Sequence, residues 1–262
     1  MIRALSSAAQ KYTFLLRELI ARDFKVKYKR SALGMLWSLL YPVMMMAVMA
    51  LVFQNVFRFT TAGVSYLSYL MTGLTLFNYF SEASNLAMSS VVANSALIRK
   101  VYMPKYIFPL SKCLFVGINF LLTLLPLYAV ILLTGTGLCW QHLLLPFDWL
   151  CLLSFTLGMG LLLSAAAVFL RDLFYIYSIV LTIWTYLTPI MYDLSAIGNR
   201  TLIALMKLNP LYQYIAFART VILYHATPQP RQFLACFLSA GLFLLVGAFV
   251  FRKRQDQFLY YL

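Results

Sequence analysis

The chain has 262 residues, of which 63% are hydrophobic and 11% charged, and its formal net charge is +14 at pH 7. A soluble domain carries about 25% charged residues, so this composition excludes an ordinary globular protein that hides its apolar surface in water. A large positive charge can indicate nucleic-acid binding, but here the basic residues cluster at the ends of apolar stretches, which membrane topology explains better.

The first predicted element is an amphipathic helix over residues 11–30. Its apolar residues recur every four positions and form one ridge: Tyr12, Leu16, Ile20, Phe24 and Tyr28. Basic side chains occupy the rest of its circumference, which favours a helix lying in the membrane interface. The alternative is a helix packed on a soluble domain, but the sequence contains no evident soluble domain for it to cover.

This helix ends in a run of cations, directly before the first long apolar stretch. The run contains Lys25, Lys27, Lys29 and Arg30. Cations at a membrane surface attract anionic groups, so the run could hold lipid headgroups or a pyrophosphate. Its simpler role is to set the topology and to anchor the chain.

Six uncharged windows then reach the roughly 20 residues that a helix needs to cross a bilayer. The window over residues 113–147 exceeds one helix, but its Thr-Gly-Thr-Gly string and residues 142–146 predict a helix followed by a loop. The predicted spans are residues 31–57, 64–90, 106–133, 148–170, 173–192 and 231–251. We expect no cleaved signal peptide, because the basic segment precedes a long apolar window without a small-residue cleavage site.

Two segments between the spans are helical in pattern but do not suit a membrane-crossing helix. Residues 94–104 are too polar for the membrane and predict a short cytoplasmic helix that could dock a partner. Residues 201–224 are apolar but interrupted at Asn209-Pro210, so they predict re-entrant or interfacial helices. We see no low-complexity tract and no internal repeat.

The fourth span contains a cluster of small residues: Gly158, Gly160, Ser164, Ala165 and Ala167. Small residues let helix backbones approach closely within lipid. This cluster therefore predicts close packing of the fourth span against a neighbouring helix.

The distribution of Lys and Arg selects an orientation. If the N-terminus is cytoplasmic, the outer segments hold only five of the 21 basic residues: Arg58, Arg200, Lys207, Arg219 and Arg231. The positive-inside rule favours this arrangement, which places both termini in the cytoplasm.

The chain lacks the residues of an enzyme. No glycine-lysine pair occurs, so a Walker phosphate loop is excluded and any energy from ATP must come from another subunit. His142 and His225 lie in predicted outer loops, far apart in sequence and without a nearby cysteine or carboxylate arrangement that resembles a metal site. We therefore expect no catalytic residue and no metal. Glu82 is the acid most apt to lie within a span, facing a water-filled lumen or paired with a polar neighbour.

Several strings along the chain form a distinctive set. They are RDFKVKYKRS at 22–31, LG at 33–34, LWSL at 36–39, LIRKVYMP at 97–104, RD at 171–172, LTPI at 187–190 and LNPL at 208–211. The set resembles the permeases of polysaccharide ABC exporters, a type-2 ABC transporter membrane-subunit family that includes O-antigen and teichoic-acid exporters. One departure is Tyr41-Pro42, where asparagine-proline is common.

The resemblance implies an all-α membrane protein, one permease domain over residues 1–262 with six transmembrane helices, an N-terminal interfacial helix and re-entrant helices before the last span. It implies a location in the cytoplasmic (inner) membrane and a homodimer with two copies of a separate ATP-binding-cassette ATPase, which would bind ATP and Mg²⁺. The substrate would be an undecaprenyl-pyrophosphate-linked polysaccharide, such as O-antigen or teichoic acid. No nucleic acid is expected as a partner.

The resemblance also suggests roles for particular residues. The helix that couples to the ATPase would contain Asn94, Ser95, Ala96, Leu97, Ile98, Arg99 and Lys100, although a basic loop that only fixes topology has the same composition. Capture of the lipid pyrophosphate would use Lys25, Lys27, Lys29 and Arg30. Aromatic rings that stack on sugars in a glycan channel would include Tyr41, Phe77, Tyr177, Trp184 and Tyr186, although such rings more commonly fill packing or lipid-facing positions. Residues 201–224 would form an outer gate.

Two other functions remain open from the sequence. A type-2 ABC permease for a drug or another lipid shares the six-span plan but usually lacks the basic entrance string. A polyprenol-dependent membrane glycosyltransferase would need acidic or metal-binding residues near the membrane surface, and this chain has no such cluster.

Overall fold

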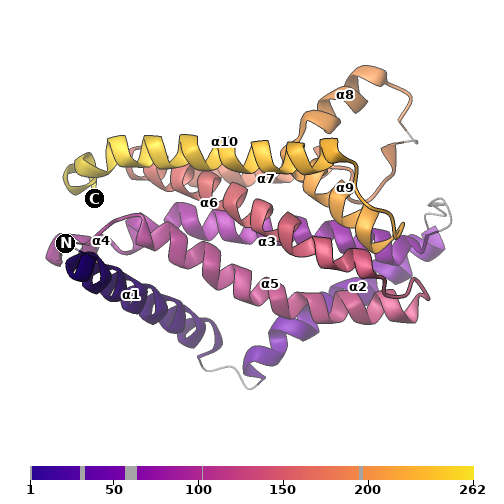
Figure 1. Ribbon diagram of the computed structural model, residues 1–262, viewed down its shortest axis with the longest axis horizontal. Coiled ribbons are helices and arrows are strands. Elements are labelled where there is room, and N and C mark those ends of the chain that lie inside the picture. The colour runs from indigo at the N-terminus through magenta and orange to yellow at the C-terminus, as the bar shows by residue number, and fades with distance from the viewer. Residues whose placement is uncertain (1, 30–32, 57–63, 102, 195–196) are drawn as a thin grey trace.

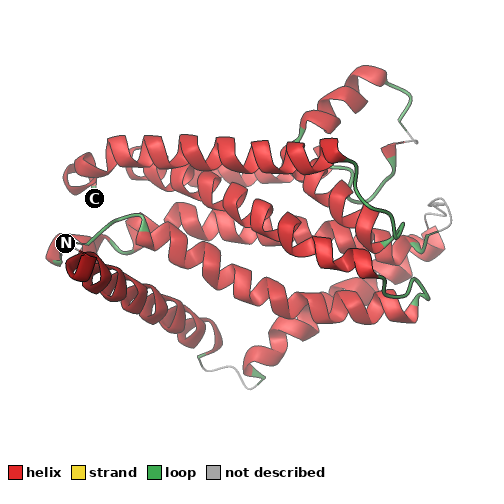
Figure 2. Cartoon of the chain, in the orientation of Figure 1, coloured by secondary structure: helices red, strands yellow, loops and turns green. Residues whose placement is uncertain are grey.

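The computed structural model describes residues 2–29, 33–56, 64–101, 103–194 and 197–262. Within these residues the chain forms helices joined by loops and contains no strand (Figure 2), which confirms the all-α prediction for the described part. The α-helices are α1 (Ile2–Tyr28), α2 (Trp37–Val56), α3 (Tyr66–Ala93), α4 (Ser95–Lys100), α5 (Ile107–Leu133), α6 (Leu145–Phe169), α7 (Leu173–Leu187), α8 (Arg200–Leu208), α9 (Pro210–Ile222), α10 (Pro230–Arg254) and α11 (Phe258–Tyr261).

The long helices run back and forth along one axis of an elongated bundle. The most extensive packing joins α6 to α10 and α3 to both α5 and α6. The N-terminus, α4 and the C-terminus lie at one end of the bundle (Figure 1). Helix α8 projects from the bundle nearer the opposite end. The short helix α4 therefore lies at the same end as both termini.

Among the described residues, three helical stretches are long and apolar enough to cross a membrane: Ile107–Leu133, Trp140–Phe169 and Pro230–Tyr261. The apolar helix α7 is shorter, at 15 residues. Helix α3 has 28 residues but carries many hydroxyl and amide side chains, and much of it is buried inside the bundle. The number of spans, predicted as six, stays a prediction.

The boundary before α6 differs from the sequence prediction. Residues 142–146 were predicted as a loop, but Trp140–Leu144 forms a 3-10 helix and α6 begins at Leu145. Pro146 lies in the first turn of α6, where its missing N–H costs no hydrogen bond because the first backbone donors of a helix are unpaired in any case. The chain does divide into two helices within this window, with the break at residues 134–139, and α6 begins three residues before the predicted span at 148.

The break at Asn209-Pro210 is confirmed. The Asn209 side chain accepts a hydrogen bond from Leu211 N at 3.0 Å and caps α9, while Pro210 begins the helix. Helix α8 buries only Met206, whereas α9 buries most of its length against the bundle. Residues 201–224 thus form two short helices of different character, and their re-entry into a membrane stays a prediction.

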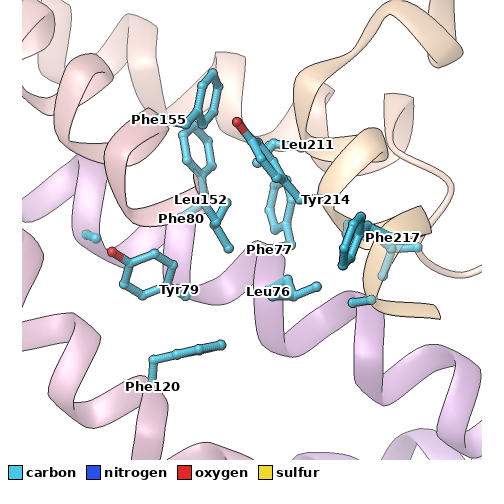
Figure 3. Close-up of a cluster of buried hydrophobic side chains, with 14 of the residues drawn as sticks. Leu76, Phe77, Tyr79, Phe80, Phe120, Leu152, Phe155, Leu211, Tyr214 and Phe217 are labelled. Atoms are coloured by element: carbon cyan, nitrogen blue, oxygen red, sulfur yellow. The ribbon is translucent and has the colours of Figure 1, made fainter. Parts of the chain in front are cut away.

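The core is aromatic and lies where α3, α6 and α9 meet (Figure 3). The ring of Phe155 lies 5.4 Å from that of Phe80 and 5.7 Å from that of Tyr214, centroid to centroid. Phe77 belongs to the same cluster and is only 4% exposed. Between helices in lipid, the stabilisation comes from packing and not from the exclusion of water, so the fit of these rings matters.

Helices α6 and α10 approach each other most closely at two glycines. A Cβ atom added to Gly158 would overlap the backbone of Phe243, and one added to Gly247 would overlap the backbone of Gly158. This contact confirms the close packing that the small residues of the fourth span predicted.

Candidate functional site

A buried apolar cluster at the end of the bundle connects the short helix α4 to the rest of the chain. We call this cluster the terminal hub; its buried members are Leu19, Val91, Ile98, Ile107, Phe108, Leu161, Ala165, Val168, Phe251 and Phe258. These residues come from α1, α3, α4, α5, α6, α10 and α11. A displacement of α4 is therefore transmitted to several long helices through direct packing, since close-packed side chains resist compression.

Helix α4 itself presents one apolar residue inward and several residues outward. Ile98 is 6% exposed and belongs to the terminal hub, whereas Ala96, Arg99 and Lys100 are exposed. Ser95 and Leu97 are half-buried. The predicted helix at 94–104 is thus confirmed over Ser95–Lys100, and two cations project from its last turn.

Asn94, at the junction of α3 and α4, connects these helices to α1. Arg22 Nη1 donates to Asn94 Oδ1 at 3.1 Å, and Asn94 Nδ2 donates to Ser90 O at 2.7 Å. Asn94 is 8% exposed and its bond to Ser90 O is buried, whereas the side chain of Arg22 is 45% exposed. A buried side chain that bonds two helices at once fixes their relative position, because breaking either bond leaves an unsatisfied polar group.

A buried ion pair fixes α1 to α5 on the adjoining turn. Lys112 Nζ lies 2.7 Å from Asp23 Oδ2, and Arg22 Nη2 lies 3.3 Å from Asp23 Oδ1. The side chain of Asp23 is 8% exposed and that of Lys112 is 16% exposed. The buried face of α1 is therefore centred on Leu19 and Asp23. Four residues of the predicted apolar ridge are partly buried beside them: Leu16, Ile20, Phe24 and Tyr28.

The predicted cation run does not act as one cluster in this conformation. Lys25 and Lys29, four residues apart, share one exposed face of α1. Lys27 lies on another face of the helix, and its Nζ atom is 2.9 Å from Glu82 Oε1. Arg30 lies outside the described residues. The structure thus separates Lys27 from the other two lysines. Of the two environments considered for Glu82, a water-filled lumen or a polar partner, the structure shows a polar partner, Lys27.

A cavity of about 200 Å³ opens beside the Lys27–Glu82 pair, between α2, α3 and α5. Its polar lining includes two pairs of residues spaced by one helical turn, Asn78 and Glu82 of α3 and Asn119 and Thr123 of α5. Thr75 of α3 also lines it. The Tyr28 hydroxyl donates to Asn119 Oδ1 at 3.1 Å. The last turn of α1 therefore contacts two residues that line this cavity, Glu82 and Asn119.

The rest of the cavity lining is aromatic and apolar, and includes Tyr41, Tyr79 and Phe120. Carboxylate and amide groups bond hydroxyl-rich ligands, and ring faces pack on apolar faces of a ligand. The sequence analysis singled out Tyr41 and Glu82 separately and missed this cavity. The available signal was the repeated i, i+4 placement of polar residues in otherwise apolar helices.

The five predicted channel aromatics have different environments. Tyr41 and Tyr186 are 61% and 68% exposed. Phe77 and Tyr177 are 4% and 3% exposed, and the Tyr177 hydroxyl donates to Ser84 Oγ at 2.7 Å. Trp184 is half-buried and donates from Nε1 to Asn209 Oδ1 at 2.9 Å. Phe77 and Tyr177 are packing residues here, so in this conformation neither is placed to stack on a sugar.

Sequence reasoning also missed two buried charged residues at the other end of the bundle. Arg219 of α9 is 4% exposed, donates from Nη1 to Pro189 O and from Nη2 to Ile190 O, both at 2.8 Å, and stacks on the ring of Tyr69. Asp148, in the first turn of α6, is fully buried. Arg219 thus joins α9, the segment after α7 and α3, where the sequence indicated only an outer cation.

The two histidines, far apart in sequence, lie close together in the fold. They meet on either side of Cys139, whose Sγ lies 2.9 Å from Nδ1 of His225 and 3.3 Å from Nδ1 of His142. Cys139 and His225, 86 positions apart, thus meet where two loops adjoin, which the sequence did not indicate. In the described part of the chain, no group of three or more His, Cys, Asp or Glu residues is arranged to hold a metal ion.

The sequence of this chain matches one family model and several known proteins. The family model described as ABC-2 type transporter matches residues 15–223. The chain is 31% identical over 260 residues to the O-antigen export system permease protein RfbA of Myxococcus xanthus, covering 98% of each chain. A Klebsiella pneumoniae protein of the same name is 26% identical over 239 residues, or 90% of each chain. The polysialic acid transport protein KpsM of Escherichia coli is 22% identical over 244 residues, or 92% of this chain and 93% of that one.

Proposed function

We propose that this chain, which belongs to the ABC-2 type transporter family, is the membrane subunit of an ATP-driven polysaccharide exporter. The relatives named above as O-antigen and polysialic acid export proteins support this substrate class. Polypeptides of this family are permease subunits without an ATPase site of their own, so the ATP and Mg²⁺ would be bound by a separate ATP-binding-cassette protein. The observation that carries the proposal is the attachment of α4 to the terminal hub.

In this proposal one end of the bundle faces the cytoplasm, namely the end that contains α1, α4 and the last turns of α10. Six helices cross the membrane. Most Lys and Arg residues lie in segments at this end, as the positive-inside rule requires. Helix α1 lies along the inner surface, and α8 and α9 form an outer gate. Fusion of a reporter enzyme to residue 95 tests the orientation, because external activity at this position would contradict it.

Coupling to the ATPase would use the exposed side of α4. Ala96, Arg99 and Lys100 would contact the ATPase, while Ile98 passes the displacement to the terminal hub. The bond between Arg22 and Asn94 would move α1 together with α4. A charged, exposed surface backed by a rigid core suits a contact that must transmit motion.

The coupling role is tested by replacing residues 94–100 with a Gly/Ser linker in the complex with its ATPase. We expect the complex to assemble and to hydrolyse ATP while export of surface polysaccharide is lost. A finer test compares Arg22→Gln with Arg17→Gln, since Arg17 is an exposed arginine on the same helix. Export that survives the linker replacement in a normally assembled complex would contradict the coupling role.

The substrate would enter as a polyprenyl-pyrophosphate-linked glycan from the inner leaflet. Lys25 and Lys29 would attract the pyrophosphate, because charge-assisted contacts to phosphate are strong at an interface where bulk water is partly excluded. The cavity beside Lys27 and Glu82 would hold a sugar next to the pyrophosphate, with its amide groups bonding hydroxyls. Tyr41 would supply a ring face.

The capture step is tested with the double variant Lys25→Gln/Lys29→Gln, and Arg17→Gln, which removes one exposed charge elsewhere on the same helix, serves as the control. We expect the concentration of lipid-linked glycan that half-stimulates the ATPase to rise several-fold in the double variant only. Correct insertion must be verified with a reporter at residue 95, since these charges also set topology. An unchanged half-stimulating concentration in correctly inserted protein would contradict this role.

A second copy of the chain would complete the pathway. Helix α7 buries only Tyr177 and Leu181, and exposes large apolar and aromatic side chains such as Ile179, Ile183 and Tyr186. Two copies facing each other through such helices would enclose a path that one copy leaves open. Cross-linking through cysteines introduced at Ile183 tests this arrangement, and the expected product is a disulfide-linked dimer in membranes.

The second candidate is export of a drug or of another lipid. The family match alone does not distinguish these substrates from a glycan. Purified complex whose ATPase is stimulated by lipid-linked glycan and not by unglycosylated polyprenyl phosphate or hydrophobic drugs would support the proposal. A polyprenol-dependent membrane glycosyltransferase is the candidate from another class; among the described residues, no group of three or more His, Cys, Asp or Glu side chains is arranged to hold a metal ion.

A further inference from the structure

A groove of about 510 Å³ lies at the same end of the bundle but apart from the cavity described above. Its walls come from α1, the segment before α5, and the last turns of α10 with the residues that follow. Figure 1 shows both chain ends at this end of the bundle, near the C-terminal end of α10. Its polar rim belongs neither to the proposed coupling surface of α4 nor to the proposed substrate path.

The groove is amphipathic along its length. Its floor is formed by apolar side chains of three helices, namely Leu110 of α5, Leu157 and Leu161 of α6, and Ala248 and Phe251 of α10. Its rim is polar and carries Lys105, Arg252 and Asp256, which gives the rim one net positive charge. An apolar floor beneath a cationic rim matches a molecule that has an acyl chain and an anionic headgroup.

The two cations of the rim are held in different ways. Lys105 Nζ donates to Gln255 O at 2.5 Å and lies 5.7 Å from the ring centroid of Phe258, so its ammonium group is fixed over the groove. Arg252 is exposed and forms no ion pair with any residue that the structure describes. Arg252 therefore has donors available to a phosphate, for which its planar group is well suited.

The floor of the groove is rigid. Leu157 and Ala248 are the sequence neighbours of Gly158 and Gly247, where the backbones of α6 and α10 touch. Leu161 and Phe251, one turn further along, belong to the terminal hub. A preformed apolar floor lowers the entropy lost when a chain is immobilised on it.

We propose that this groove is a binding site for one anionic glycerophospholipid, whose phosphate lies between Lys105 and Arg252 and whose acyl chain lies along α6 and α10. The bound lipid joins α1, the segment before α5 and the C-terminal segment, and so stabilises the terminal hub from its outer side. A zwitterionic phospholipid fits the same floor but brings its own ammonium group to the cationic rim, so it binds more weakly. The site does not depend on the proposed transport function.

The first experiment measures lipid binding to the purified full-length chain. Native mass spectrometry of protein delipidated in detergent, titrated with phosphatidylglycerol or with phosphatidylethanolamine, should show at least several-fold tighter binding of the anionic lipid. Arg252→Gln should lose this preference, whereas Lys253→Gln should keep it. Lys253 is the matched control, because it is the next basic residue on the same helix, is exposed, and does not line the groove.

A second pair of variants tests the apolar floor without any change of charge. Ala248→Phe fills the floor, whereas Val246→Phe places the same bulk at an exposed position of α10 outside the groove. The thermal shift that phosphatidylglycerol produces should be lost in Ala248→Phe and kept in Val246→Phe. Equal binding of both lipids to the wild type, an unchanged preference in Arg252→Gln, or the same thermal shift with inorganic phosphate alone would each overturn the proposal.

Discussion

The contact between α6 and α10 predicts that one chemical change has opposite effects at two glycines of the same helix. Alanine at Gly247 would place its Cβ against the backbone of Gly158, which cannot move aside as a flexible side chain could. Alanine at Gly241, on the same helix, meets no atom within 4 Å. We therefore expect Gly247→Ala to destabilise the protein and Gly241→Ala to stabilise it slightly.

The magnitudes follow from two opposing terms. Replacing glycine by alanine inside a helix gains about 0.5–1 kcal/mol of helix stability, because the unfolded chain loses conformational freedom. Overpacking a close contact costs about 1–3 kcal/mol when the helices must separate. Gly241→Ala shows only the gain, and Gly247→Ala combines both terms to a net loss of roughly 0.5–2 kcal/mol.

Unfolding of the detergent-solubilised chain by increasing mole fraction of sodium dodecyl sulfate, followed by tryptophan fluorescence, provides the measurement. Gly158→Ala should resemble Gly247→Ala, since its added Cβ meets the backbone of Phe243. Equal stability of Gly247→Ala and Gly241→Ala would refute the argument, because it would mean that α6 and α10 separate at no cost.

Two further predictions concern polar contacts inside the bundle. A double-mutant cycle should give a coupling free energy above about 1.5 kcal/mol for the buried pair Asp23–Lys112, since hydrogen bonds to charged groups in buried sites reach this range. The same cycle should give about 0.2–1 kcal/mol for the more exposed pair Lys27–Glu82, and the reverse order would contradict the burial seen here. Arg219→Lys should cost about 1.5–3 kcal/mol in the same unfolding assay, because lysine lacks the planar fork that bonds several backbone carbonyls at once. A cost below 0.5 kcal/mol would show that Arg219 does not hold α9 in place.

Residues that end helices or allow close packing made parts of the fold predictable from the sequence. Asn209-Pro210 marks a helix boundary because the amide caps the next helix and the proline cannot continue the previous one. Residues 94–100 were predictable as a short polar helix between apolar stretches, and Gly158 as a site of close packing. Each of these features depends on residues near one another in the sequence.

Features that depend on residues far apart were not predictable. Tyr177 and Tyr186 lie on one helix and look alike in sequence, yet one is 3% and the other 68% exposed. In a membrane protein both the lipid-facing and the inward faces of a helix are apolar, so periodicity does not distinguish them. The meeting of Cys139 with His225, and of Lys27 with Glu82, likewise depends on how helices and loops are arranged in space.

The distribution of packing indicates which helices can move when α4 is displaced. Helix α6 packs extensively on α10 and on α3, and α3 packs extensively on α5, while the terminal hub joins these helices to α1 and α4. Helix α2 packs mainly against α5 and only slightly against α3, and α7 makes few contacts with α3 and α6. A force applied at α4 therefore moves the well-packed helices as one body, because their separation would break many contacts at once. The relative motion falls on α2 and α7, where fewer contacts resist it. Since α2 forms one wall of the cavity beside Lys27 and Glu82, that motion changes the width of the cavity in which we place the first sugar.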